Sequence, residues 1–208
     1  MTGEPRTVGI LVYEGCDLLD VGGPYEAVLT ADRLQARRRA EPRFEVRTLA
    51  TDLEPVTAYG GLELGGHRRL QEVDHLDVVV IPGTVDVDAA LGDARLVTAV
   101  GELASRSDLV ASVCTGSFLL AAAGLLEGRN ATTHHEDLAA LAAREDVGAV
   151  HGGLRFVVDG QVVTAAGLSS GLSLGLHLVD RLVGRELALA TAQQLEHPFD
   201  PTGRDGVA

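Results

Sequence analysis

The sequence predicts an α/β fold, a doubly wound domain in which helices cover both faces of a mostly parallel sheet. Short apolar, β-branched runs alternate with longer amphipathic segments, which is the pattern of β–α–β units. Hydrophobic residues make up 46% and charged residues 23% of the 208 residues, as in globular proteins. No linker, repeat or low-complexity segment interrupts the pattern. We therefore expect a single domain over residues 1–208, with its core at about 7–200.

The first elements follow from local pattern. Residues 7–13 (TVGILVY) form a short apolar, β-branched run, which predicts a buried strand. Residues 18–38 show the spacing of a helix, and Pro24 predicts that this helix begins there, because proline is tolerated in a first turn. Residues 44–50 predict a second strand.

The middle of the chain carries the strongest strand signal. The pair Gly60-Gly61 predicts a turn between two short extended pieces in residues 56–64. Residues 76–81 (LDVVVI) predict a buried strand that ends at Pro82-Gly83. Residues 93–106 are amphipathic and predict a helix. Residues 109–113 predict another strand, which runs directly into Cys114 and a further helical stretch.

The last third of the chain predicts a capped helix, a hairpin and two closing helices. Thr133 and Glu136 match a capping box before a Leu/Ala-rich helix. Asp159-Gly160 lies between two Val pairs in residues 154–164, which predicts a hairpin with a type I′ turn. Residues 169–183 and 186–195 predict the closing helices.

Composition argues against several classes of partner and cofactor. The formal net charge of −13 repels phosphate backbones, and 3% aromatic residues without Trp leave no stacking platform, so we expect no nucleic-acid binding. Two cysteines make neither a disulfide framework nor a zinc site, so no metal or cofactor is predicted. The N-terminus lacks the apolar segment of a signal peptide, so we expect a cytoplasmic protein with no membrane partner.

Cys114 is the most informative candidate residue. It follows a predicted strand and precedes a predicted helix, among small neighbours, and a sharp turn of this type presents a nucleophile at the edge of a sheet. The N–H groups and the positive end of the following helix are expected to lower the pKa of its thiol. The alternative is a structural cysteine that fills the core.

Asp20 is the second candidate, a carboxyl group between apolar residues at the end of the first loop. Burial there raises a carboxyl pKa, so that the group can hold or deliver a proton near neutral pH. The alternative is an acidic residue that favours the start of a helix. Asp17 and Glu26 are nearby rivals, and we expect Asp17 to be more exposed than Asp20.

Backbone N–H groups of Gly83, Thr84 and Thr115 are candidates for stabilising a developing negative charge. The alternative for Gly83 is an ordinary Pro-Gly turn. Cys16 lies beside acidic residues that raise the pKa of a thiol, so we expect a bystander.

Other polar positions carry weaker signals. His134 follows a short predicted strand and could reach the site, although local turns explain it equally well. Ser173, His177 and Asp180 share a stripe of a predicted helix, which predicts a solvated or subunit-facing surface. Glycines 167, 171 and 175 recur every four residues, and this spacing permits close packing against the sheet or against another chain.

Four strings occur in an order that resembles the ThiJ/PfpI superfamily, over about residues 7–200. They are TVGILVYEGCDLLDVGGPYEAV, LDVVVIPGT, SVCTGSFLLAAAGLLEGRNATTH and LSSGLSLGLHLVDRLVG. The similarity is closest to the branch that contains isonitrile hydratases and the sensor domains of AraC-type regulators. It implies a flavodoxin-like fold and a homodimer.

The resemblance also implies a function and a set of site residues. It implies a cofactor-free lyase that adds water to a small-molecule isonitrile, giving an N-substituted formamide. Cys114 is then the nucleophile, Asp20 the general acid and base, and Thr115 an assisting residue. The pocket residues implied are Gly83, Thr84, Gly22, Pro24 and His134.

The chain departs from the pattern of this branch at three positions. Thr84 replaces the second glycine of a PGG string, His135 replaces a tryptophan, and Ser173 replaces an aspartate. Two other functions stay open on the sequence. One is a glyoxalase- or deglycase-like enzyme that acts on α-oxoaldehydes, and the other is a non-catalytic small-molecule sensor.

Overall fold

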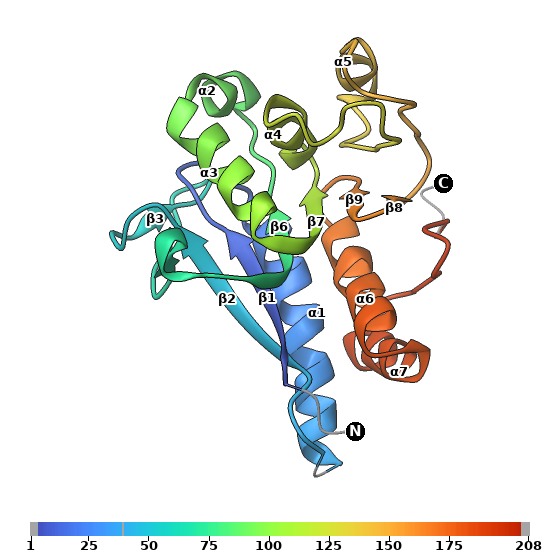
Figure 1. Cartoon of the computed structure of the whole chain (residues 1–208). Coiled ribbons are helices and arrows are strands. Elements are labelled where there is room, and N and C mark those ends of the chain that lie inside the picture. Colours follow the sequence, from blue (N-terminus) through green and yellow to red (C-terminus); the bar gives the residue numbers. More distant parts are fainter. Residues whose placement is uncertain (1–3, 39, 205–208) are drawn as a thin grey trace.

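A computed structural model describes residues 4–38 and 40–204 of the protein. Residues 1–3, 39 and 205–208 of the predicted domain lie outside this description. A seven-stranded sheet forms the centre, in the order β5-β2-β1-β6-β7-β9-β8 (Figure 1). Every neighbouring pair is parallel except β8 and β9, which are antiparallel. The predicted α/β class with a mostly parallel sheet is confirmed.

The elements follow the predicted order, with three short additions. The strands are β1 (Arg6–Leu11), β2 (Phe44–Ala50), β3 (Val56–Thr57), β4 (Glu63–Leu64), β5 (Arg68–Arg69), β6 (Leu76–Ile81), β7 (Ser107–Val113), β8 (Phe156–Asp159) and β9 (Val162–Ala165). The helices are α1 (Leu18–Arg37), the 3₁₀ turn η1 (Leu70–Glu72), α2 (Val87–Gly92), α3 (Ala94–Ser105), α4 (Gly116–Ala122), α5 (Leu138–Ala142), α6 (Ser170–Leu182) and α7 (Arg185–Leu195). The sequence pattern missed β5, η1 and α2.

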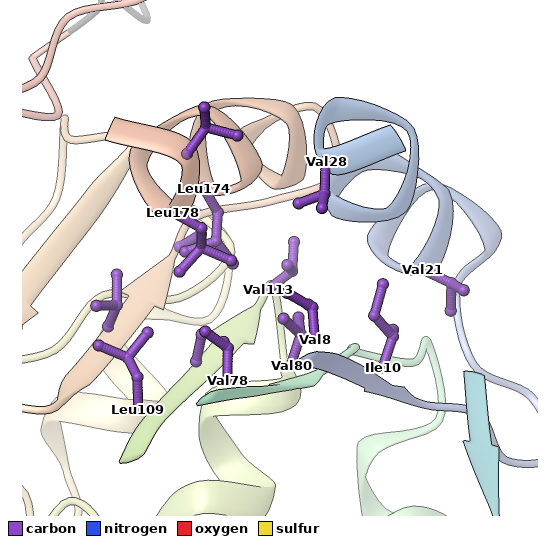
Figure 2. Close-up of a cluster of buried hydrophobic side chains, with 14 of the residues drawn as sticks. Val8, Ile10, Val21, Val28, Val78, Val80, Leu109, Val113, Leu174 and Leu178 are labelled. Atoms are coloured by element: carbon purple, nitrogen blue, oxygen red, sulfur yellow. The ribbon is translucent and has the colours of Figure 1, made fainter. Parts of the chain in front are cut away.

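Buried apolar side chains lie on both faces of the sheet. Successive residues of a strand point to opposite faces, so each central strand supplies both clusters. Val8 of β1 packs in one cluster with Val28 of α1 and Leu174 of α6 (Figure 2). Leu11 of the same strand packs in the other with Leu119 of α4. Strands covered on both faces explain why β1, β6 and β7 read as continuous apolar runs.

Helix α1 begins at Leu18, so the prediction that it begins at Pro24 is wrong. The first turn forms before the proline, with the Val21 N–H donating to the Asp17 carbonyl at 3.3 Å. Contacts from outside the helix hold this turn. A Cβ on Gly23 would lie 3.0 Å from backbone atoms of Gly171 and Leu172 in α6. Tertiary packing therefore overrides the local preference of proline for a first turn.

The helix cap and the hairpin turn predicted for the last third of the chain both need correction. Thr133 does not cap a helix, because α5 begins at Leu138 after Asp137, and the Thr133 hydroxyl donates to the Cys114 carbonyl instead. The β8–β9 hairpin is present, but its two-residue loop is Gly160-Gln161. Of these two loop residues, only Gly160 has a positive φ, of 63°. A type I′ turn needs a positive φ at both central residues, so the turn fits type II′.

The glycine stripe packs inside the chain. A Cβ on Gly175 would lie 2.5 Å from the Ala27 Cβ and 3.0 Å from the Pro24 Cα, and Gly171 contacts the Pro24 ring. These glycines let α6 approach α1 closely. Within the described residues, no helix combines the length and the apolar character needed to cross a membrane.

Candidate active site

Three loops meet at the carboxyl edge of the sheet, after β1, β6 and β7. An isolated β-bridge joins Cys16 to Thr84, and the Asp17 N–H donates to the Gly83 carbonyl at 2.9 Å. Ligands of open α/β sheets bind at this edge, next to the point where the strand order reverses. Here the reversal falls between β1 and β6. The predicted site residues of these loops are therefore brought together.

Cys114 sits at the strand-to-helix turn between β7 and α4, as predicted. Its φ is +57°, a conformation that costs a non-glycine residue about 1–3 kcal/mol. Its N–H donates to the carbonyls of Ala165 and Ala166, both at 3.1 Å. Its carbonyl accepts the hydroxyls of Thr133 at 3.0 Å and Ser117 at 3.2 Å. These hydrogen bonds hold the backbone of Cys114 on both sides of its Cα and so fix the direction of its side chain. Cys114 is 5% exposed.

Asp20 projects from the first turn of α1 and is fully buried. Its Oδ2 accepts the Gly83 N–H at 3.0 Å, and side-chain atoms of Asp20 and Cys114 lie within 4.8 Å of each other. Burial raises the pKa of this carboxyl from 3.8 to about 7, the Gly83 N–H opposes the rise, and nearby Asp17 adds to it. Asp17 is half-buried and thus more exposed than Asp20, as predicted.

The Thr115 N–H at the start of α4 lowers the thiol pKa, as predicted, but the prediction that the pKa of Cys114 is lowered overall is wrong. Burial, and next the charge of Asp20, raise the pKa of Cys114 to about 12. The N–H groups of Thr115 and Leu168 act in the opposite direction but are outweighed. Near neutral pH, the buried pair therefore carries at most one negative charge, and this charge lies on Asp20, whose pKa is the lower of the two.

Two of the three N–H groups proposed for a developing charge already have acceptors. The Gly83 N–H holds Asp20, and the Thr84 N–H donates to the Thr115 Oγ1 at 2.9 Å. The Thr115 hydroxyl in turn donates to the Thr84 carbonyl at 2.7 Å. The expectation that Gly83 and Thr84 face the charge is therefore wrong. Thr115 clamps the loop after β6, and Gly83 serves Asp20.

The loop after β6 has no room for a larger residue at Gly83. A Cβ there would lie 2.5 Å from the Thr115 Oγ1 and 2.9 Å from the Asp20 Oδ2. Thr84, which departs from the family pattern, donates through its hydroxyl to the Gly15 carbonyl at 2.8 Å. This bond ties the loops after β1 and β6 together.

The remaining pocket candidates take different places. Pro24 packs against Gly171 and Gly175 of α6, away from a pocket role, and a Cβ on Gly22 would meet no atom within 4 Å. His134 is half-buried, and a Cβ on Gly167 would lie 2.2 Å from its Cδ2. The His134 ring also lowers the pKa of Asp17, so it lies close to this carboxyl group.

The predicted solvated stripe on α6 is not solvated. Ser173 is fully buried and hydrogen-bonds His197 at 3.0 Å. The His177 ring lies 4.6 Å from the Phe156 ring, and burial lowers its pKa to about 4. Cys16 is fully buried, and its pKa is raised first by burial and then by the charges of Asp17 and Asp20.

Two contributors to the site were missed by sequence reasoning. Leu168 has φ +41°, and its N–H faces the Cys114 sulfur, although no sequence signal marks a strained leucine. Tyr13 donates its hydroxyl to the Pro82 carbonyl at 2.9 Å. Its position at the end of the first predicted strand could have pointed to the carboxyl edge.

A cavity at this edge of the sheet has a volume of about 600 Å³ and is lined by Tyr13, Gly15 and Thr84 and by residues of β2 and α3. Cys114 is not one of its lining residues. Because Cys114 is only 5% exposed, access to its sulfur is narrow. Side-chain atoms of Asp17, Asp20 and Cys114 lie within 4.8 Å of one another, so this trio is also the set that could contact a cation. It lacks the imidazoles and paired thiolates typical of zinc sites.

Comparisons with known proteins show which family the chain belongs to. It is 33% identical to the isonitrile hydratase of Pseudomonas putida over 205 residues, which cover 95% of this chain and 83% of that protein. It is 29% identical to the transcriptional regulator GbdR of Pseudomonas aeruginosa, covering 91% of this chain and 50% of the regulator. The crystal structure of a ThiJ/PfpI family protein from Pseudomonas syringae superposes with a TM-score of 0.81 at 30% identity, covering 95% and 77% of the two chains. The model of the DJ-1/PfpI family matches residues 7–181, and the chain belongs to this family.

Proposed function

We propose that the protein is a cofactor-free lyase that hydrates an isonitrile to an N-substituted formamide. The observation that carries this proposal is the buried pair of Cys114 and Asp20, whose side-chain atoms lie within 4.8 Å of each other. A thiol whose pKa is raised to about 12 is a poor nucleophile alone. A carboxyl group of pKa about 7 beside it accepts the thiol proton as the sulfur attacks and then returns it as an acid.

In the first step, the Cys114 sulfur forms a bond to the terminal isonitrile carbon. The thiol proton passes to the Asp20 carboxylate and from there to the same carbon. The product is a thioimidate, R–N=CH–S–Cys114, in which the C–N bond order has fallen from three to two. The Leu168 and Thr115 N–H groups face the sulfur and stabilise its negative charge during attack.

In the second step, water adds to the thioimidate carbon while the Asp20 carboxylate accepts a water proton and passes it to nitrogen. The tetrahedral adduct R–NH–CH(OH)–S–Cys114 then collapses. The C–S bond breaks, the hydroxyl proton returns through Asp20 to the sulfur, and R–NH–CHO leaves. The net change is the addition of one water, and the protein returns to its starting state.

Two further observations support this choice of substrate. Cys114 is only 5% exposed, and a terminal isonitrile carbon on a linear N≡C group is thin enough to reach a sulfur in a narrow opening. The hydratase relative covers nearly the whole chain. The homodimer and the pocket roles of Gly22 and His134 belong to the same proposal.

Incubation with cyclohexyl isocyanide tests the proposal. We expect N-cyclohexylformamide to form and its rate to fall by roughly 10³-fold or more in Cys114→Ala, because the nucleophile is gone. The measurement is product formation by mass spectrometry. Cys16→Ala serves as the matched control, since it removes the other cysteine. Full activity in Cys114→Ala would contradict the mechanism.

A small-molecule sensor is the second candidate, favoured by the similarity to a transcriptional regulator over 91% of this chain. It predicts saturable binding of an isonitrile or a related small molecule with no turnover and no dependence on Asp20. Lactate formation from methylglyoxal, without formamide formation, would instead point to the glyoxalase-like alternative.

A further inference from the structure

Tyr13 lies beside the site, but the proposed mechanism does not use it. It follows β1, and its hydroxyl donates to the Pro82 carbonyl at 2.9 Å. The pKa of the phenol is raised well above 10.0 by burial and by the surrounding acidic groups. The phenol therefore stays protonated at working pH and remains a hydrogen-bond donor.

The acceptor of this bond belongs to the peptide group that holds Asp20. The carbonyl of Pro82 and the N–H of Gly83 are the two ends of one planar peptide group. The first accepts from Tyr13, and the second donates to the Asp20 Oδ2 at 3.0 Å. A hydrogen bond at a peptide oxygen polarises the group and strengthens its N–H as a donor.

The peptide group has little freedom to move. A Cβ on Gly116 would lie 2.9 Å from the Pro82 oxygen, and one on Gly83 would lie 2.9 Å from the Asp20 Oδ2. The chain is thus packed tightly on both sides of this peptide, and the Tyr13 hydroxyl fixes its remaining orientation.

We propose that Tyr13 is a positioning residue for the Cys114–Asp20 pair, acting through the Pro82–Gly83 peptide group. Its hydroxyl orients and polarises this peptide, so that the Gly83 N–H binds the charged form of Asp20 more strongly. The role in turnover rests on the proposed function, whereas the effect on Asp20 does not, because it concerns the resting protein.

Several titratable groups act on the same carboxyl and must be held constant in a test. Asp17 faces it from the preceding loop, Cys114 from the turn after β7, and Cys16 and Tyr13 from the loop after β1. His134 acts on Asp17. Tyr13→Phe removes a hydroxyl but none of the groups that change charge near pH 7.

The test is the rate of Cys114 alkylation by iodoacetamide against pH, with the modified residue located by mass spectrometry. No isonitrile is needed, so the result stands apart from the hydratase assay. We expect the inflection of the rate near pH 7 to move up by about 0.5 pH unit in Tyr13→Phe. Alkylation at pH 6 then slows about three-fold, and the rate above pH 8 is no lower. A merely structural defect would change the rate at every pH.

Tyr25→Phe is the matched control, because this tyrosine is also partly buried but lies along α1. A second measurement is expected to shift the inflection of the alkylation rate in the opposite direction. The chain has three tyrosines, so 3-fluorotyrosine incorporated into the Tyr25→Phe, Tyr59→Phe variant replaces Tyr13 alone. Its more acidic phenol is a stronger donor, and the inflection is expected to move down. An unchanged inflection in both experiments, or a shift in the same direction in both, would overturn the proposal.

Discussion

Asp20→Asn is expected to stabilise the protein at pH 8 while removing most of its catalytic activity. The folded-state pKa of Asp20 is raised to about 7 from 3.8, so the folded protein binds an extra proton between these values. Stability from this group is therefore complete below pH 3.8 and is lost as pH rises to about 7. The loss amounts to roughly 4 kcal/mol, at about 1.4 kcal/mol per pH unit. Asparagine keeps an acceptor for Gly83 and carries no charge.

Thermal unfolding at two pH values measures this gain. We expect Asp20→Asn to raise the Tm by roughly 10 °C at pH 8 and to leave it nearly unchanged at pH 4. Formamide production is expected to fall by roughly 10²–10⁴-fold, because the acid and base is lost. Asp88→Asn, an exposed change on α2, is the control and should leave Tm and activity unchanged. A lower Tm for Asp20→Asn at pH 8 would show that the carboxylate stabilises the fold.

Gly116→Ala is expected to destabilise the protein by about 3 kcal/mol or more. A Cβ at this position would lie 2.3 Å from the Ile81 oxygen and 2.9 Å from the Pro82 oxygen. Both are backbone atoms at the end of β6 and cannot turn away as a side chain would. The start of α4 must move away from β6, and Cys114 moves with it.

Urea unfolding at pH 5 measures this change away from the titration of Asp20. Gly101→Ala in α3 is the matched control, because a Cβ there would meet no atom within 4 Å. Because a Cβ has open space here, an alanine at this helix position should instead raise stability by about 0.5–1 kcal/mol. Equal midpoints for the two variants would mean that α4 and β6 are not packed as tightly as these distances indicate.

The site residues that could be predicted from the sequence were those whose place relative to the strands and helices is evident from the pattern. Parallel strands end at one edge of a sheet, so the loops after β1, β6 and β7 could be expected to meet. Cys114 followed directly from the junction of a strand and a helix. Asp20 followed from a single acidic residue in an apolar segment. In both cases, the pattern and the tertiary structure agree because the loops are short.

The partners of each polar group could not be predicted in the same way. From the sequence pattern alone, the N–H groups of Gly83 and Thr84 were expected to be free for a ligand. In the structure they donate to Asp20 and Thr115. The sign of the Cys114 pKa shift was also missed, because it depends on how deeply the thiol is buried. Likewise, the start of α1 is decided by its packing on α6, which lies about 150 residues along the chain.

The pH dependence of Cys114 alkylation in the unmodified protein tests the central claim, that the Asp20 carboxylate accepts the Cys114 thiol proton as the sulfur attacks. Near neutral pH the thiol is protonated, so the rate should follow the fraction of Asp20 that is ionised. We therefore expect the rate to rise through an inflection near pH 7, the pKa of Asp20, and then to level off. In Asp20→Asn the inflection should disappear. A wild-type rate that climbs about ten-fold per pH unit from pH 5 to pH 9, with no inflection near pH 7, would contradict the account.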